Sequence, residues 1–312
     1  MKMNRNLFVS VCMLLTAALC VVSCSKDDDE DGGSSEANVN RNDVSQEPLL
    51  GRLEFPSVKK GTSMVIIHKT SDVYSKGVNY AVEWDSEKKA QRWTCYQMIY
   101  KDNMKYTGGV GRTESSFSED PDLPSSKRLS NSNSFYSFAY SNYKMERGHM
   151  CPSRDRQYSA AANGQTFYYT NAHPQYHHFN SGDNGKYSPW YRIEEKVGKW
   201  AEVTTTDTLY VVKGGTIEDS QLLMKVKDEL RVPKYFFVAL LAKNKQGYKA
   251  IGFWMEHKST AYTGQESLGS YAVNIHSLEA RTGIDFFCNL PDKTEKEVEE
   301  LPVENCRKAW GI

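Results

Sequence analysis

Short apolar runs recur along the chain from Phe55 onward, and most of them are typical of strands. Residues 80–85 and 92–98 are two such runs, and the polar residues 86–89 between them predict a hairpin turn. Further runs lie at 64–68, 166–170, 209–212, 235–241, 248–255 and 283–287. They are rich in β-branched and aromatic residues, which favour strands.

Helical spacing of apolar residues appears in three other places. Residues 190–201 show it most clearly, and they follow Ser188 and Pro189, which are typical of a helix N-cap and a first helical position. Residues 268–279 and 295–301 are the other two predicted helices. Because strands and helices do not alternate regularly, the pattern predicts an α+β fold with a mainly antiparallel central sheet flanked by helices.

The N-terminal segment has a different pattern. A basic start precedes an apolar run over residues 7–22, which is too short for a comfortable membrane span and predicts a signal peptide over 1–23. Val-Val-Ser-Cys at its end resembles a lipobox, so Cys24 is expected to carry a lipid anchor. The anchor predicts export to the outer membrane. The acidic residues that follow resemble a surface-export signal, with a plain linker as the alternative.

Residues 24–47 hold eight acidic and two basic residues and few apolar ones, which predicts a disordered tether. The folded domain is therefore expected over 48–312. The whole chain has 39 basic and 39 acidic residues, so the domain is left mildly basic. Such a balance tolerates a polyanionic partner without requiring one. The function therefore has to be inferred from local clusters of residues.

Four cysteines fall in the predicted domain: Cys95, Cys151, Cys288 and Cys306. In an exported domain they indicate disulfides, and three connectivities are possible. One of these joins Cys288 to Cys306 across a short terminal loop and Cys95 to Cys151. Four buried free thiols are the alternative.

The densest chemistry lies in residues 143–156, where Glu146, Arg147 and His149 occur within one short segment. A histidine can take a proton from water at neutral pH, and arginines neutralise phosphoryl oxygens with paired donors. Asn171 and Asn180, further along the chain, offer neutral oxygen atoms to a hard cation. These residue types together predict a metal-assisted phosphodiesterase site.

The order of these motifs resembles the DNA/RNA non-specific endonucleases of the ββα-metal type. Their Asp-Arg-Gly-His signature corresponds to residues 146–149, and their Thr/Ser-Asn-x-x-Pro-Gln to residues 170–175. Their Trp-x-x-aliphatic-Glu corresponds to residues 190–194. An upstream Arg, a Phe and Asp-Pro-x-Leu-Pro correspond to Arg112, Phe117 and residues 120–124. The resemblance extends from about residue 60 to 310 and implies a ββα-metal active-site motif.

The resemblance also implies roles for individual residues. His149 would be the general base, and Asn180 the one direct protein ligand of Mg²⁺ or Mn²⁺. Glu194 would hold metal-bound water, and Asn171 would position His149 or a phosphate oxygen.

Arg147 and Arg112 are implied to neutralise the phosphate. In-line attack by water would leave 5′-phosphate and 3′-hydroxyl ends on DNA and RNA. Contacts to the backbone alone would give little sequence preference and a strong salt dependence.

The chain departs from the family pattern in two places. Glu146 replaces the usual Asp and is one methylene longer, and the spacing between Asn180 and Trp190 is longer than usual. The added residues make Asn184 an alternative metal ligand. His173, His177 and His178 also allow a zinc site, although Pro174 interrupts any helix between them. Two alternative functions are a nucleic-acid-binding lipoprotein without catalysis and a phosphatase for small phosphate esters.

Overall fold

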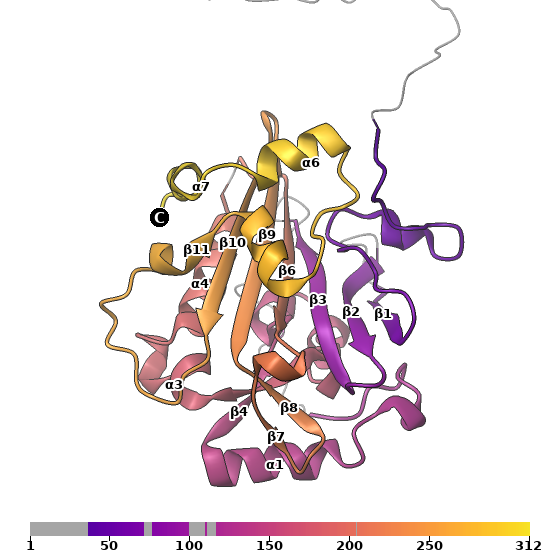
Figure 1. The fold of residues 1–312 in the computed structure, drawn as a ribbon, viewed down its shortest axis with the longest axis vertical. Coiled ribbons are helices and arrows are strands. Elements are labelled where there is room, and N and C mark those ends of the chain that lie inside the picture. The colour runs from indigo at the N-terminus through magenta and orange to yellow at the C-terminus, as the bar shows by residue number, and fades with distance from the viewer. Residues whose placement is uncertain (1–36, 72–76, 100–109, 111–116, 204) are drawn as a thin grey trace, which may run out of the picture. The chain divides into compact units, whose positions relative to one another are not determined.

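The computed structural model describes residues 37–71, 77–99, 110, 117–203 and 205–312 (Figure 1). The expected leader over 1–23, the lipidation site Cys24, most of the acidic part of the tether and Arg112 lie outside the described residues. Among the described residues, no helix is long and apolar enough to cross a membrane.

A seven-stranded sheet in which every neighbouring pair is antiparallel forms the centre of the domain (Figure 1). Its strand order is β1 (Ser63–Lys69), β2 (Val78–Asp85), β3 (Ala90–Met98), β6 (Thr208–Gly215), β9 (Tyr235–Asn244), β10 (Gly247–Glu256) and β11 (Ala272–Val273). The predicted α+β class and the predicted hairpin over 80–98 are confirmed.

The two faces of this sheet carry separate apolar clusters. Val238 of β9 lies in one cluster, and its neighbours Phe237 and Ala239 lie in the other. The first cluster also includes α4 (Pro189–Ala201) and α7 (Val303–Trp310), and the second includes α5 (Ile275–Thr282) and α6 (Asp292–Glu299). Because both faces are covered, the central strands are apolar at successive positions rather than at alternate ones.

The remaining elements form a smaller region around two two-stranded ribbons. The elements are α1 (Ser132–Tyr143), β4 (Met145–His149), α2 (Ala160–Gln165), β5 (Ala172–Tyr176), α3 (His177–Asn180), β7 (Leu222–Val226) and β8 (Leu230–Pro233). Strand β4 pairs with β5, and β7 pairs with β8. Helix α1 contacts both ribbons and lies with them at one end of the sheet in Figure 1.

Seven short 3-10 helices complete the described chain: η1 (Pro48–Gly51), η4 (Ser125–Lys127), η5 (Ser153–Arg156), η6 (Tyr169–Asn171), η7 (Asp183–Gly185), η8 (Asp219–Gln221) and η9 (Leu268–Tyr271). The strand predicted over 166–170 is wrong, because a turn and η6 occupy it and the strand begins at Ala172. The strand predicted over 283–287 is also absent. Phe286 and Phe287 are buried there against the sheet without joining it.

Residues 37–47, expected in the tether, contact the C-terminal part of the domain. The Asn42 backbone N–H donates to Asn289 Oδ1 at 3.1 Å, and its side-chain amide donates to the Pro56 carbonyl at 3.0 Å. The Asn38 amide donates to the Leu290 carbonyl at 2.6 Å. These contacts show that residues 37–47 pack as part of the domain, although the sequence predicted them to be the last part of the disordered tether.

The predicted disulfides are wrong. Cys95, Cys151, Cys288 and Cys306 are all buried free thiols. Cys95 belongs to the apolar cluster on one face of the sheet, and the Cys288 thiol donates to the carbonyl of Phe55, a residue of the same cluster. Cys151 and Cys306 belong to the cluster on the other face. The sheet therefore separates the partners of both expected pairs. Burial raises the pKa of the Cys151 thiol to about 12, which favours the neutral form of that side chain.

Candidate active site

The charged motif of the sequence lies on strand β4, which pairs antiparallel with β5 so that His149 faces Ala172. Helix α3 follows β5 directly, which gives the order strand, strand, helix. Gly148 is required at the centre of the ribbon. A Cβ atom there would lie 1.9 Å from Gln175 Oε1, so any side chain would displace the buried Gln175.

Glu146 connects this ribbon to α3 through its carboxylate. Asn180 donates its amide N–H to Glu146 Oε2 at 2.7 Å, and Ser181 donates its hydroxyl to the same oxygen at 2.8 Å. His177 Nδ1 lies 2.7 Å from Glu146 Oε1, and this hydrogen bond raises the pKa of His177. The longer side chain that replaces the family's Asp therefore reaches three partners on and beside α3.

The contact with Glu146 also fixes the orientation of the Asn180 amide. Its nitrogen points at the carboxylate, and its oxygen accepts no hydrogen bond from the described residues. A neutral amide oxygen presented in this way is a suitable ligand for a hard divalent cation. The residues present therefore fit the metal that the family resemblance implies.

His149 is held at the end of β4 by contacts on several sides. Its ring centroid lies 4.9 Å from the Phe117 ring and 5.0 Å from the Phe167 ring. The Trp190 indole N–H donates to the His149 backbone carbonyl at 3.2 Å. This bond links His149 to Trp190 at the start of α4, the helix that also carries Glu194.

Asn171 fixes the backbone that follows His149. Its buried side chain accepts from the Cys151 N–H and donates to the Cys151 carbonyl, both at 2.8 Å, and it also donates to the Thr166 carbonyl. These contacts occupy the amide of Asn171. The structure therefore places Asn171 behind the site, as a support for the segment carrying His149.

A pocket of about 620 Å³ brings three of the predicted residues together. His149, Asn180 and Glu194 all line it, although they come from β4, α3 and α4. Arg154, which is exposed, lines it as well. The pocket therefore contains a base, an amide oxygen, a carboxylate and a guanidinium around one space.

Arg147 lies apart from this group. Its guanidinium donates to Asn133 Oδ1 and to the Ser137 hydroxyl of α1, each at 3.2 Å, and lies 5.9 Å from the centroid of the Phe117 ring. Arg112 and the side chain of Asn184, the other predicted candidates, lie outside the described residues.

Glu194 has a perturbed carboxyl group. Burial raises its pKa to about 7, the nearby Asp155 adds to this effect, and Lys213 opposes it. Lys213 is fully buried, with Nζ 3.4 Å from Glu194 Oε1. Only 17% of the Glu194 side chain is exposed, so the raised pKa follows from limited solvation of the carboxylate.

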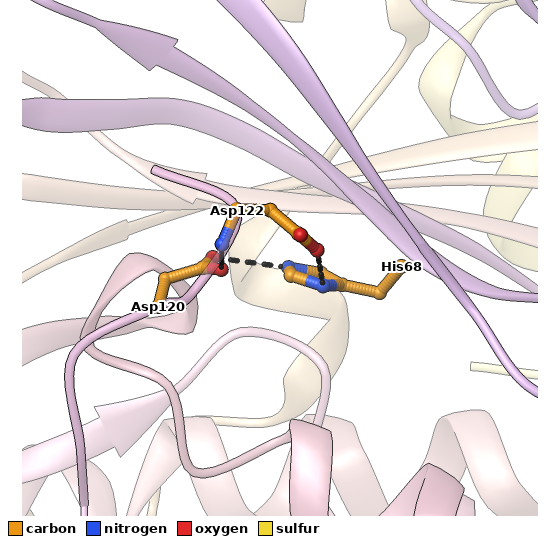
Figure 2. A group of neighbouring side chains, drawn as sticks. All are labelled: His68, Asp120 and Asp122. Atoms are coloured by element: carbon orange, nitrogen blue, oxygen red, sulfur yellow. Dashed lines mark hydrogen bonds and ion pairs between the residues drawn. The ribbon is translucent and has the colours of Figure 1, made fainter. Parts of the chain in front are cut away.

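A second group with metal-binding composition lies beside the site. His68 of β1, Asp120 and Asp122 place ligand atoms within 4.8 Å of one another (Figure 2). His68 Nε2 lies 3.1 Å from Asp120 Oδ2, and Nδ1 lies 3.5 Å from Asp122 Oδ2. Asp120 also accepts from the Thr170 hydroxyl and the Asp122 N–H.

Burial alone would raise the pKa of Asp120, but His68 and these donors outweigh it and lower that pKa. Because the Asp120 oxygens already have partners, the group serves to connect β1 with the segment before Asn171. Among the described residues it is the one histidine–carboxylate group with metal-ligand spacing, so His173, His177 and His178 form none there.

The family model for DNA/RNA non-specific endonucleases matches residues 61–293. The chain belongs to the DNA/RNA non-specific endonuclease family. It is 28% identical over 243 residues to the mitochondrial nuclease EXOG of Mus musculus, a match that covers 73% of this chain and 60% of that protein. It is 27% identical over 222 residues to nuclease C1 of Cunninghamella echinulata, which covers 69% of this chain and 83% of the relative.

The fold agrees with this membership. The solved complex of EndoG with EndoGI matches with a TM-score of 0.57 and 18% identity, covering 73% of this chain and 89% of that one. The family motif is therefore carried by the ribbon β4–β5 and helix α3 beside a large antiparallel sheet.

Sequence reasoning missed two residues of the site. Arg154 stands within the charged segment 143–156, so the signal was present, but the prediction chose Arg147, which is closer to His149 in the sequence. Lys213 gave no signal, because it is a single lysine in an otherwise apolar strand. Only the fold shows that it faces Glu194.

Proposed function

We propose that this chain is a metal-dependent, sugar-non-specific endonuclease that hydrolyses phosphodiester bonds of DNA and RNA. The observation that carries the proposal is the shared pocket of His149, Asn180 and Glu194, with Glu146 turning the Asn180 amide oxygen away from itself. Family membership supports nucleic acid as the substrate.

The residues divide the reaction among them. An imidazole nitrogen of His149 accepts the proton of the attacking water, whose oxygen forms the new bond to phosphorus while the P–O3′ bond breaks. The departing O3′ takes a proton from water in the pocket, which leaves a 5′-phosphate and a 3′-hydroxyl. Asn180 would hold the Mg²⁺-class ion through its amide oxygen. That ion, when bound, supplies positive charge to the phosphoryl oxygens and assists departure of the leaving oxygen.

Two further residues support this chemistry. Glu194, in its ionised form, accepts hydrogen bonds from water in the pocket. Arg154 is the described arginine placed to neutralise a phosphate oxygen there. Arg147 supports the neighbouring wall through α1.

The test uses the full chain on plasmid DNA and on RNA, with Mg²⁺ and with chelator. His149→Ala is expected to lower both cleavage rates by about 10²–10⁴-fold, because removal of a general base has effects of this size. His276→Ala, which changes an exposed histidine of α5, is the control and should cleave as the wild type does.

Three outcomes would contradict the proposal. Full cleavage by His149→Ala would remove His149 as the base. Binding of nucleic acid without cleavage by the wild type would favour a binding lipoprotein. Release of phosphate from mononucleotides alone would favour a phosphatase.

We also propose that the chain is exported and anchored in the outer membrane through a lipid on Cys24. The supporting observation is the apolar leader followed by Val-Val-Ser-Cys. Cys24→Ser should move the protein from the membrane fraction to the soluble fraction, and unchanged fractionation would contradict the anchor.

A further inference from the structure

A second pocket, of about 420 Å³, adjoins the catalytic one. This volume lies within the range of about 300–1,000 Å³ that is usual for small-molecule sites. The end of α1, the start of β4 and the start of α3 line it. Its lining includes Tyr140, Tyr143 and Lys144 together with Tyr176 and His178.

The two pockets are linked through one carboxylate. Glu146 and His177 line the second pocket, and Glu146 is hydrogen-bonded to Asn180 and Ser181, which line the first. A polymer chain with its phosphate beside Asn180 therefore has the second pocket as its immediate neighbour. The nucleic acid bound at Asn180 could therefore reach this pocket directly, so the pocket needs no separate ligand.

The side chains of the second pocket suit an unpaired base. Tyr140 is 55% exposed and Tyr143 is 40% exposed, so both rings offer accessible aromatic surface. Scattered exposed tyrosines need no explanation, but these two line the same hollow. Every base has a π-face that can stack on such a ring.

Lys144 adds a fixed positive charge at the same place. It ends α1 in the left-handed region, with φ 57°, where its backbone N–H bonds to the carbonyls of Ala139 and Tyr140. Its own carbonyl accepts from the His177 N–H at 3.0 Å. Because the backbone is held on both sides, the point from which the lysine side chain projects into the pocket is fixed. Its Nζ lies 5.9 Å from the centroid of the Tyr140 ring.

We infer that this pocket is a nucleobase subsite that holds one unpaired base of single-stranded DNA or RNA next to the phosphate to be cleaved. The inference rests on the proposed function for its substrate. A base in a duplex is stacked on both faces and paired at its edge, so it cannot lie on Tyr140 or Tyr143 without leaving the helix. The subsite therefore favours single strands over duplexes.

The test measures binding in the full chain carrying His149→Ala, so that cleavage does not interfere. The probes are a fluorescent single-stranded oligonucleotide and the matching duplex, followed by anisotropy. Adding Tyr140→Ala and Tyr143→Ala is expected to weaken single-strand binding about tenfold, a loss consistent with one lost stacking interaction. Duplex binding should change less than about twofold, because phosphate contacts dominate it.

The chain offers a matched control. Tyr187 is 43% exposed and has Lys186 Nζ 5.0 Å from its ring centroid, yet it lines neither of these two pockets. Tyr187→Ala should leave both affinities unchanged. Replacing Tyr140 and Tyr143 by Phe should keep single-strand binding, because the rings remain and only the hydroxyls are lost.

The inference is overturned if the double alanine variant binds single strands as tightly as its parent, or if it loses duplex affinity equally. An equal loss in the phenylalanine variant would also overturn it, because hydroxyl contacts would then account for the effect. Cleavage by the wild type is measured separately. Absence of cleavage with tyrosine-dependent single-strand binding would reject the proposed function and leave the subsite standing.

Discussion

Two groups of carboxylates in this domain differ in how their charge is accommodated. Beside the pocket of His149, Asn180 and Glu194, the Glu146 carboxylate accepts hydrogen bonds from Asn180 and Ser181 and faces His177. Glu194 faces the buried Lys213. Each of these carboxylates therefore has donors or a cation near it.

The second group lies between α5 and α6. Glu279, Asp285, Glu295 and Glu299 line one pocket of about 350 Å³, in which Asn40 donates to Asp285 and Glu295 and the Phe286 N–H donates to Glu279. Burial raises the pKa of Glu279 and of Glu295 to about 7 and that of Glu299 to about 10. Glu299 Oε1 has no hydrogen-bond partner within the described part of the chain.

The difference shows that a buried carboxylate alone does not mark a site of chemistry. In the first group, donors orient the neighbouring side chains, so the carboxylates organise a pocket. In the second group, burial outweighs the donors and favours the protonated carboxyl groups, and the consequence is a dependence of stability on pH. Substituting the same residue type in the two groups should therefore change different properties.

The largest expected effect is on Glu146. Glu146→Ala removes the acceptor that orients the Asn180 amide and should lower the rate of plasmid cleavage about 10–100-fold, as is usual for partners of metal ligands. Glu146→Asp, which restores the family's residue, should recover most of this loss. A fully active alanine variant would show that the contact does not orient Asn180.

Lys213→Met tests the first group by removing the cation that faces Glu194. Lys213 lowers the pKa of Glu194 against the effect of burial, so its removal should raise that pKa further above about 7. Because the folded-state pKa of Glu194 already exceeds its ordinary value, its ionisation destabilises the fold as pH rises, and more so without the lysine. We expect a stability loss of roughly 2 kcal/mol at pH 8.

The loss in Lys213→Met should be smaller at pH 5, where Glu194 is protonated with or without the lysine. Denaturant unfolding at the two pH values measures it. An equal loss of stability at both pH values would mean that the variant acts through packing against Trp190 and Tyr96, whose rings also lie near Lys213.

The smallest expected effect is on Glu299, in the second group. Its folded-state pKa is raised to about 10, so the folded protein holds a proton that the unfolded chain releases above its ordinary pKa. Stability is therefore lost as pH rises. Glu299→Gln should raise the melting temperature by about 2–4 °C at pH 8, corresponding to roughly 1 kcal/mol, and leave it unchanged at pH 4. Cleavage should not change, and a lower melting temperature at pH 8 would contradict the account.

Much of the sheet could be predicted from sequence, because its strands are apolar, β-branched and bounded by turns. Strand β5 could not, since His173, Pro174 and Gln175 give no strand pattern and are held by pairing with β4. Residues 268–279 hold η9, β11 and the start of α5 instead of one helix. Local spacing there did not show that Ala272 would pair with Phe253.

The candidate site was predictable where chemistry and motif coincide. His149, Asn180 and Glu194 share the pocket as expected, because the ribbon and α4 bring them together. Arg147 stands two residues before His149 and so on the same face of β4, yet its hydrogen bonds to α1 direct its guanidinium to another wall. The cysteine pairs failed for a similar reason, because sequence does not show on which face of the sheet a side chain lies.

If His149 is the base and Asn180 is the metal ligand, Mn²⁺ binding should depend on Asn180 and not on His149. Mn²⁺ is titrated into the wild type, His149→Ala and Asn180→Ala. His149→Ala should bind Mn²⁺ with wild-type affinity, and Asn180→Ala should bind it at least about tenfold more weakly. Both variants should lose cleavage. Unchanged Mn²⁺ binding in Asn180→Ala, or lost binding in His149→Ala, would contradict the account.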